Sequence, residues 1–151
     1  MYCMRVGRPA LLFMQKTNFK YEIIIHDDAS TDGTTEIIKE YAEKYPDLIT
    51  PIFQTENQYS KGLRGFYARF VFPKAKGKYI ALCDGDDYWA DSLKLQKQVD
   101  FLETHHDYAI CSHDFKVYNE EEKTFIGDIL TKNISSLTTN IRNLLTIFRV
   151  C

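Results

Sequence analysis

The chain has 151 residues, 44% of them hydrophobic and 26% charged, which is the composition of an ordinary globular domain with a buried core. Its formal net charge of −2 excludes a strong general attraction to nucleic acid or to an anionic membrane surface. The four cysteines lie far apart and form no C-x-x-C pair, which excludes a zinc ribbon and a dithiol redox motif. No run of about 18 apolar residues occurs, so the sequence predicts no membrane span.

The first half of the chain predicts a strand, a helix and a second strand. Residues 21–26 are rich in isoleucine and predict a buried strand of the parallel type. Apolar positions recur at helical spacing over residues 34–45. We expect this helix to have Asp32 as its N-cap and to end before Pro46. Residues 49–54 predict the second strand.

The second half continues the alternation. The apolar patterns predict a helix over residues 66–75, a strand over 78–83 and a helix over 92–104. Residues 108–118 predict a fourth strand, which a turn of glutamates connects to a hairpin partner over residues 123–126.

Strands that alternate with helices favour an α/β fold, with a mostly parallel, Rossmann-like sheet and flanking helices. The sequence shows no internal repeat and no linker of low complexity. We therefore expect residues 1–151 to form a single domain.

Acidic residues follow two of the predicted strands. Asp27 and Asp28 end the first strand, and Asp84, Asp86 and Asp87 follow the apolar run of the third. Because the carboxyl ends of parallel strands lie along one edge of a sheet, both groups are expected to face one ligand site. Clustered carboxylates repel one another and favour a cation, and oxygen ligands of this kind suit Mg²⁺ or Mn²⁺.

The two acidic segments together resemble family-2 glycosyltransferases. Residues 23–34, Ile-Ile-Ile-His-Asp-Asp-Ala-Ser-Thr-Asp-Gly-Thr, resemble the strand and loop that hold the nucleotide base in that family. Residues 76–89, which contain Asp-Gly-Asp-Asp, resemble the D-x-D region. The similarity covers about residues 14–118. It implies the A-type glycosyltransferase fold, a nucleotide-diphosphate sugar donor, a divalent metal ion (Mn²⁺ or Mg²⁺) and inversion at the anomeric carbon.

The resemblance also implies roles for individual residues. Asp28 matches the acid that accepts a hydrogen bond from the base, and Asp27 helps to form the same turn. Asp84 matches the first acid of the D-x-D motif, near the ribose and the metal. Asp86 matches the acid that binds the metal bridging the two phosphates. The nucleotide-binding residues are thus Asp27, Asp28 and Asp84, and the metal ligands are Asp86 and Asp84.

Two features typical of the family have no counterpart in this sequence. Only a short segment precedes Met14, which resembles the end of the family's first helix, so the first strand is not found. No residue matches the acid that deprotonates the acceptor hydroxyl, so the catalytic base is unknown. We therefore expect a fragment of a longer enzyme that transfers sugar poorly by itself. Its expected acceptor is a saccharide or a lipid-linked sugar, with no nucleic acid as partner. The expected location is the cytoplasm, with association at the inner face of a membrane as an option.

Three other functions remain open on the residues alone. The first is a non-catalytic remnant that binds a nucleotide. The second is a phosphatase that resembles the haloacid dehalogenases, although Asp87 and Tyr88 stand where that class has a pair of small residues. The third is a calcium loop that starts at Asp28, although Lys39 takes the position where an EF-hand has glutamate.

Overall fold

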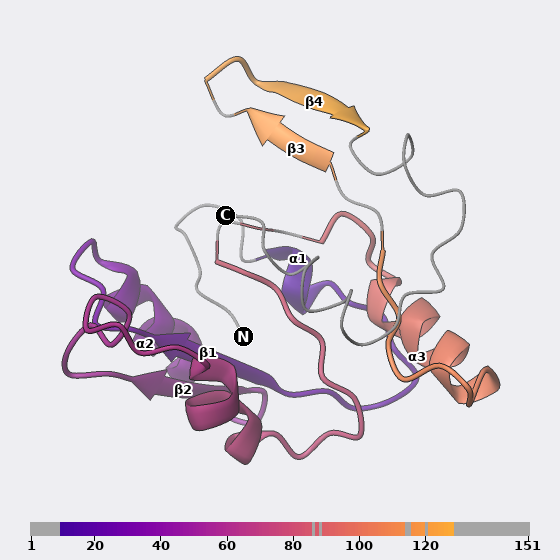
Figure 1. The fold of residues 1–151 in the computed structure, drawn as a ribbon, viewed down its shortest axis with the longest axis horizontal. Helices are drawn as coiled ribbons and strands as arrows, with labels where there is room; N and C mark the ends of the chain where they lie inside the picture. Colours follow the sequence, from indigo (N-terminus) through magenta and orange to yellow (C-terminus); the bar gives the residue numbers. More distant parts are fainter. Residues whose placement is uncertain (1–9, 86, 88, 114–115, 120, 129–151) are drawn as a thin grey trace. The chain divides into compact units, whose positions relative to one another are not determined.

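The computed structural model describes residues 10–85, 87, 89–113, 116–119 and 121–128. The chain divides into two compact units, and the first of them ends at Ala109. The first unit contains the α/β elements and the second contains a β-hairpin (Figure 1).

The elements of the first unit are, in chain order, α1 (Ala10–Phe13), β1 (Ile23–Asp27), α2 (Thr34–Lys44), β2 (Ile49–Phe53), η1 (Tyr67–Val71), η2 (Phe72–Lys74) and α3 (Lys94–Thr104). The elements of the second unit are β3 (Lys116–Asn119) and β4 (Thr124–Asp128).

The strand β1 pairs in parallel with β2, in a register that runs from Ile23 opposite Ile49 to Asp27 opposite Phe53. All residues of β1 are buried, which fits its isoleucine content, because β-branched side chains pack well on a pleated surface. The helix α2 forms the crossover that a parallel pair requires. These elements confirm the two strands predicted for the first half of the chain and the α/β class.

The start of α2 differs by one residue from the prediction. Gly33, and not Asp32, occupies the N-cap position, with a φ of 87°. Glycine reaches this left-handed conformation readily because it has no Cβ atom. Asp32 still supports the helix, since its Oδ1 accepts a hydrogen bond of 3.1 Å from the N–H of Thr34. The helix ends at Lys44, shortly before Pro46, as predicted.

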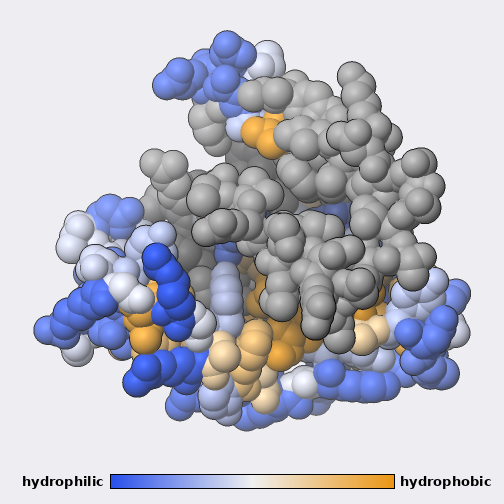
Figure 2. Space-filling model, viewed as in Figure 1, coloured by the Kyte–Doolittle hydropathy of each residue, from blue (hydrophilic) through white to orange (hydrophobic). Residues whose placement is uncertain are grey.

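A hydrophobic core joins β1 to the helices of the first unit. Its buried members are Leu12, Ile23, Ile25, Ile38, Ile49, Cys83 and Trp89. The buried side chain of Gln15 links the segment after α1 to the start of α3, because it donates to the carbonyl of Asp91 (2.9 Å) and accepts from the N–H of Leu95 (3.1 Å). The exposed positions of α2 include the charged residues Glu36, Lys39 and Glu40, and hydrophilic residues cover much of the described surface visible in Figure 2.

The predicted strand over residues 78–83 is wrong, because no strand is described there. Its apolar pattern predicted burial only in part, since Cys83 is buried and Ala81 packs against the core, whereas Ile80 is 50% exposed. A strand also needs a neighbour whose backbone groups pair with its own. Among the described residues, β1 pairs with β2 alone, and no strand is hydrogen-bonded to this segment.

The predicted helix over residues 66–75 consists of two shorter helical turns. The π turn η1 is followed directly by the 3₁₀ turn η2. Pro73 explains the break, because a proline has no N–H to donate to the preceding turn. The helix predicted over residues 92–104 is confirmed as α3, which begins at Lys94.

The predicted fourth strand over residues 108–118 is correct only in its last part, β3. Residues 108–113 form no helix or strand, and Tyr108 and Ile110 are 54% and 44% exposed. The hairpin is confirmed, because β3 pairs with β4 in antiparallel orientation. Its turn is closed by Asn119, whose Oδ1 accepts hydrogen bonds from the backbone N–H groups of Glu121 (2.9 Å) and Glu122 (3.1 Å).

The full burial of Ile38 on α2 predicts a large effect of shortening its side chain. Ile38→Ala should lower the free energy of unfolding by about 2–5 kcal/mol, because the substitution removes buried methyl groups and leaves a cavity. Urea unfolding followed by circular dichroism measures the change. Glu40→Ala, at an exposed position of the same helix, is the matched control and should stay within about 0.5 kcal/mol of the unsubstituted chain. Equal losses for both variants would contradict the assignment of Ile38 to the core.

Candidate functional site

The carboxylate of Asp27, the last residue of β1, is 1% exposed and shapes the turn that follows the strand. Its Oδ1 accepts a hydrogen bond from the N–H of Ser30 (3.1 Å), and its Oδ2 accepts one from the hydroxyl of Thr35 in α2 (2.5 Å). Ala29 lies inside this turn with a φ of 59°, which is uncommon for a residue other than glycine. Asp27 therefore joins the end of β1 to the first turn of α2.

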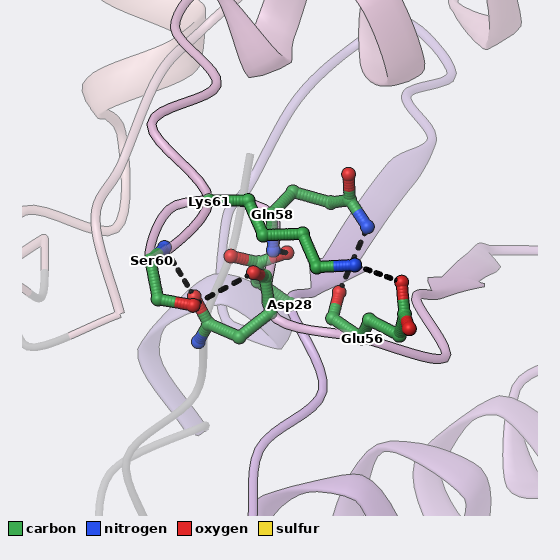
Figure 3. A network of polar contacts seen from close by, with 6 residues as sticks. Asp28, Glu56, Gln58, Ser60 and Lys61 are labelled. Carbon is green, nitrogen blue, oxygen red and sulfur yellow. Dashed lines mark hydrogen bonds and ion pairs between the residues drawn. The ribbon is translucent and has the colours of Figure 1, made fainter.

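Asp28 points away from this turn toward the loop after β2. Its Oδ1 accepts a hydrogen bond of 2.9 Å from the backbone N–H of Gln58, and its Oδ2 accepts one of 2.9 Å from the backbone N–H of Tyr59. Hydrogen bonds to an ionised acceptor are among the stronger ones in proteins. The carboxylate of Asp28 thus holds the loop against the carboxyl end of β1 (Figure 3).

The loop around Asp28 also has hydrogen bonds of its own. Asn57 accepts from the N–H of Ser60 at its Oδ1 (2.7 Å), and the Ser60 hydroxyl donates to the carbonyl of Asn57 (2.9 Å). Lys61 forms an ion pair with Glu56, and this hydrogen bond lowers the pKa of the Glu56 carboxyl. Figure 3 shows Glu56, Ser60 and Lys61 near Asp28. The loop is therefore held by several polar contacts at once.

Three basic residues lie in this region, and each has a partner in the structure. The Lys61 amine is paired with Glu56. The guanidinium of Arg64 lies 5.0 Å from the ring centroid of Tyr59, and that of Arg69 lies 5.9 Å from the ring centroid of Phe70. The side chain of Tyr59 is 63% exposed, so the Arg64–Tyr59 pair lies at the surface beside Asp28.

Asp84 is an exposed residue that follows the buried Cys83. Its Oδ1 accepts a hydrogen bond of 2.8 Å from the hydroxyl of Tyr67, the first residue of η1. Burial, and next the neighbouring Asp84 carboxylate, raise the pKa of the Tyr67 phenol above its ordinary value of 10.0. The phenol is therefore protonated near neutral pH and acts as the donor. Sequence reasoning did not find Tyr67, because nothing in its local pattern points to Asp84.

The two acidic groups are held by the same segment of the chain. Gln58 and Tyr59 donate to Asp28 at the start of this segment, and Tyr67 donates to Asp84 at its end. The segment from Gln58 to Tyr67 therefore connects the acid that follows β1 to the acid that follows the third apolar run.

The predicted metal site is described only in part, because Asp86 lies outside the described residues. Among the residues that the structure does describe, no group of three or more His, Cys, Asp or Glu side chains is gathered as a metal ligand set. Asp87 donates its backbone N–H to the carbonyl of Asp84 (3.0 Å), so the chain turns here. Asp84 suits a hard cation, because it is an exposed carboxylate with one oxygen already oriented by Tyr67.

His26 is a buried residue of β1 in the site region. It is 3% exposed, its ring stacks on Phe70 at a centroid distance of 5.3 Å, and its Nε2 lies 3.0 Å from the amide nitrogen of Gln54. Burial lowers the pKa of the His26 imidazole, against the opposing effect of the Asp28 and Asp27 carboxylates. The neutral ring connects β1 to η1, which carries Tyr67.

The sequence matches the family model "Glycosyl transferase family 2" over residues 10–150. The chain therefore belongs to this family, and its α/β fold agrees with the Rossmann-like architecture that the resemblance implied. The match favours this family over the alternatives of a phosphatase and an EF-hand loop.

The curated relatives include proteins of several bacteria. The uncharacterized protein Rv1520 of Mycobacterium tuberculosis is 50% identical over 99 residues, which make up 64% of this chain and 27% of that protein. The UDP-Glc:alpha-D-GlcNAc-diphosphoundecaprenol beta-1,3-glucosyltransferase WfaP of Escherichia coli is 41% identical over 92 residues, or 60% of this chain and 33% of that protein. An uncharacterized glycosyltransferase of Nostoc sp. is 37% identical over 103 residues, or 68% of this chain and 30% of that protein. The matched region thus spans about a third of these relatives or less. No solved structure matches the chain.

The burial of His26 predicts a pH dependence of stability. Since the folded state lowers the pKa of this imidazole below its ordinary value of 6.5, the unfolded chain binds the proton more readily. The contribution of His26 to the free energy of unfolding is therefore complete above pH 6.5 and is lost as the pH falls from 6.5 toward the lower folded pKa. Urea unfolding between pH 5 and pH 8 should show less of this loss in His26→Gln. The exposed His106→Gln is the control, and parallel curves for all three proteins would contradict the assignment.

The contacts of Asp28 predict a local change on removal of its charge. In Asp28→Asn the amide side chain offers one acceptor oxygen instead of two, so one of the two backbone N–H groups loses its partner. Hydrogen exchange at the amide of Gln58 or Tyr59 should become about tenfold faster, because a hydrogen bond to a charged group contributes about 1.5–3 kcal/mol. Amide exchange followed by NMR measures this. Asp32→Asn keeps the oxygen that accepts from Thr34 and should leave both amides unchanged; if it accelerates them equally, the effect is not local to Asp28.

Proposed function

We propose that this chain is the donor-binding part of a glycosyltransferase that transfers a sugar from a nucleotide-diphosphate donor to an acceptor hydroxyl with the help of Mn²⁺ or Mg²⁺. The observation that supports this most is that Asp28 and Asp84 both accept hydrogen bonds from the segment from Gln58 to Tyr67. Membership of glycosyl transferase family 2 supports the reaction class.

Asp28 is the proposed acceptor for the nucleobase. A carboxylate has about four lone-pair positions, and the two backbone N–H groups use one on each oxygen. The remaining positions suit the imide N–H of a pyrimidine such as uracil. Asp27 supports this arrangement, because its buried carboxylate fixes the turn from which Asp28 extends.

Asp84 and Asp86 are proposed to hold the divalent cation, with Asp84 also near the ribose. When bound, the cation neutralises negative charge that develops on the departing nucleoside diphosphate. Asp84 contributes an oriented carboxylate to this site, because the Tyr67 hydroxyl holds its Oδ1. The catalytic base stays unassigned.

The proposed acceptor is a saccharide or a lipid-linked sugar. The name of the Escherichia coli relative describes a sugar linked to diphosphoundecaprenol as its acceptor. This name supports a lipid-linked sugar as the acceptor class here. The helices of the described residues are all too short or too polar to cross a membrane. We propose a cytoplasmic location, with acceptors presented at the inner face of a membrane.

The proposal predicts that UDP and Mn²⁺ bind better together than either binds alone, because the cation connects the protein carboxylates to the phosphates. Asp86→Asn should weaken UDP binding in the presence of Mn²⁺ by about tenfold or more, and should change metal-free UDP binding little. Isothermal titration calorimetry measures both. Asp47→Asn removes an exposed carboxylate elsewhere and is the matched control.

Equal binding by the unsubstituted chain and Asp86→Asn would contradict the metal role of Asp86. Because the chain by itself is expected to transfer sugar poorly, the synergy of UDP and Mn²⁺, and not sugar transfer, is the readout of its donor-binding role.

A further inference from the structure

We propose that Tyr67 is a positioning residue that orients the Asp84 carboxylate toward the bound cation and nucleotide. The inference rests on the proposed function, because it concerns the same site. It adds a residue that neither the motif nor the family match indicates, since Tyr67 lies outside the D-x-D segment.

The contact itself is a single directed hydrogen bond. The Tyr67 hydroxyl donates to Asp84 Oδ1 over 2.8 Å. Among the residues that the structure describes, no group donates to the other oxygen, Oδ2. A carboxylate at an exposed position rotates about its side-chain bonds, and one donor at Oδ1 restricts this rotation. Asp84 is therefore held with Oδ1 toward Tyr67 and with Oδ2 left for a ligand.

The tyrosine is held by a packed part of the structure. Its ring is half-buried and stacks on Phe72 at a centroid distance of 6.2 Å. In the same helical segment Val71 is 3% exposed, and Phe70 stacks on the buried ring of His26 in β1. The side chain of Tyr67 therefore has few alternative positions. Its hydroxyl donates to Asp84 from a fixed place.

The geometry of η1 also fits this role. The N–H of Phe72 donates to the carbonyl of Tyr67, which closes a π turn. Turns of this kind are rare and occur frequently at functional sites. Here the π turn begins with the residue that contacts Asp84.

A direct test uses Tyr67→Phe, which removes the hydroxyl and keeps the ring that packs on Phe72. UDP binding in the presence of Mn²⁺ should weaken about tenfold, because partners that orient a ligating group typically contribute 10- to 100-fold. UDP binding without metal should weaken less than binding with Mn²⁺, and the midpoint of thermal unfolding should change no more than in the control Tyr79→Phe. Titration calorimetry and differential scanning fluorimetry give the two readouts.

Tyr79→Phe is the matched control. The Tyr79 hydroxyl also donates to a carboxylate, that of Glu103, over 3.0 Å at the surface of α3. The control loses a hydrogen bond of the same kind at a different place in the same unit. It should leave UDP binding unchanged with and without Mn²⁺.

A double-mutant comparison separates positioning from general stabilisation. If Tyr67 acts through Asp84, then Tyr67→Phe should have no further effect on Mn²⁺-dependent UDP binding in the Asp84→Asn background. Full additivity of the two substitutions would overturn the inference.

The outcomes also distinguish the inference from the proposed function. Loss of binding in Asp84→Asn together with normal binding in Tyr67→Phe would overturn the positioning role alone. An unsubstituted chain that binds UDP no better with Mn²⁺ than without it would overturn both.

Discussion

The parallel hydrogen-bond ladder between β1 and β2 is the constraint on which the site region depends. In a parallel pair the two strands end at the same edge of the sheet, so Asp28 and the loop after β2 emerge side by side. The ladder continues one step beyond β2, because the N–H of Gln54 donates to the carbonyl of Asp27 over 2.9 Å. Burial of all residues of β1 fixes the position of this edge. The hydrogen bonds from Gln58 and Tyr59 to Asp28 follow from that proximity.

Three carboxylates of the site region accept hydrogen bonds from other groups of the chain. Asp27 joins its strand to α2, Asp28 holds the loop after β2, and Asp84 accepts from the phenol of Tyr67. Each acid thus has a structural role in the free chain, and Asp28 and Asp84 keep lone pairs that a ligand can use. Groups whose orientation is fixed before binding lose less entropy when the ligand arrives. The arrangement therefore suits the recognition of a polar, charged molecule such as a nucleotide diphosphate, which the family membership also favours.

The local sequence pattern predicted most helices and two strands of the first unit, because burial along a helix or strand follows directly from the spacing of apolar residues. It was wrong over residues 78–83, where Cys83 is buried and Ala81 packs against the core but no strand is described. Apolar content reports burial, whereas a strand requires a second backbone beside it. The pattern over residues 66–75 likewise predicted a helix, but Pro73 limits it to two short turns.

The sequence by itself determined the α/β class, the acids that follow β1 and the third apolar run, and the family to which they point. Only the tertiary structure decided which groups meet these acids. Asp28 receives its hydrogen bonds from residues 30 and 31 positions away, and Asp84 receives its hydrogen bond from a residue 17 positions away. The stacking of His26 on Phe70 likewise joins residues that are far apart in the sequence. Periodicity describes neighbours within a few residues along the chain, whereas these contacts arise from the crossover that brings β1, β2 and η1 together.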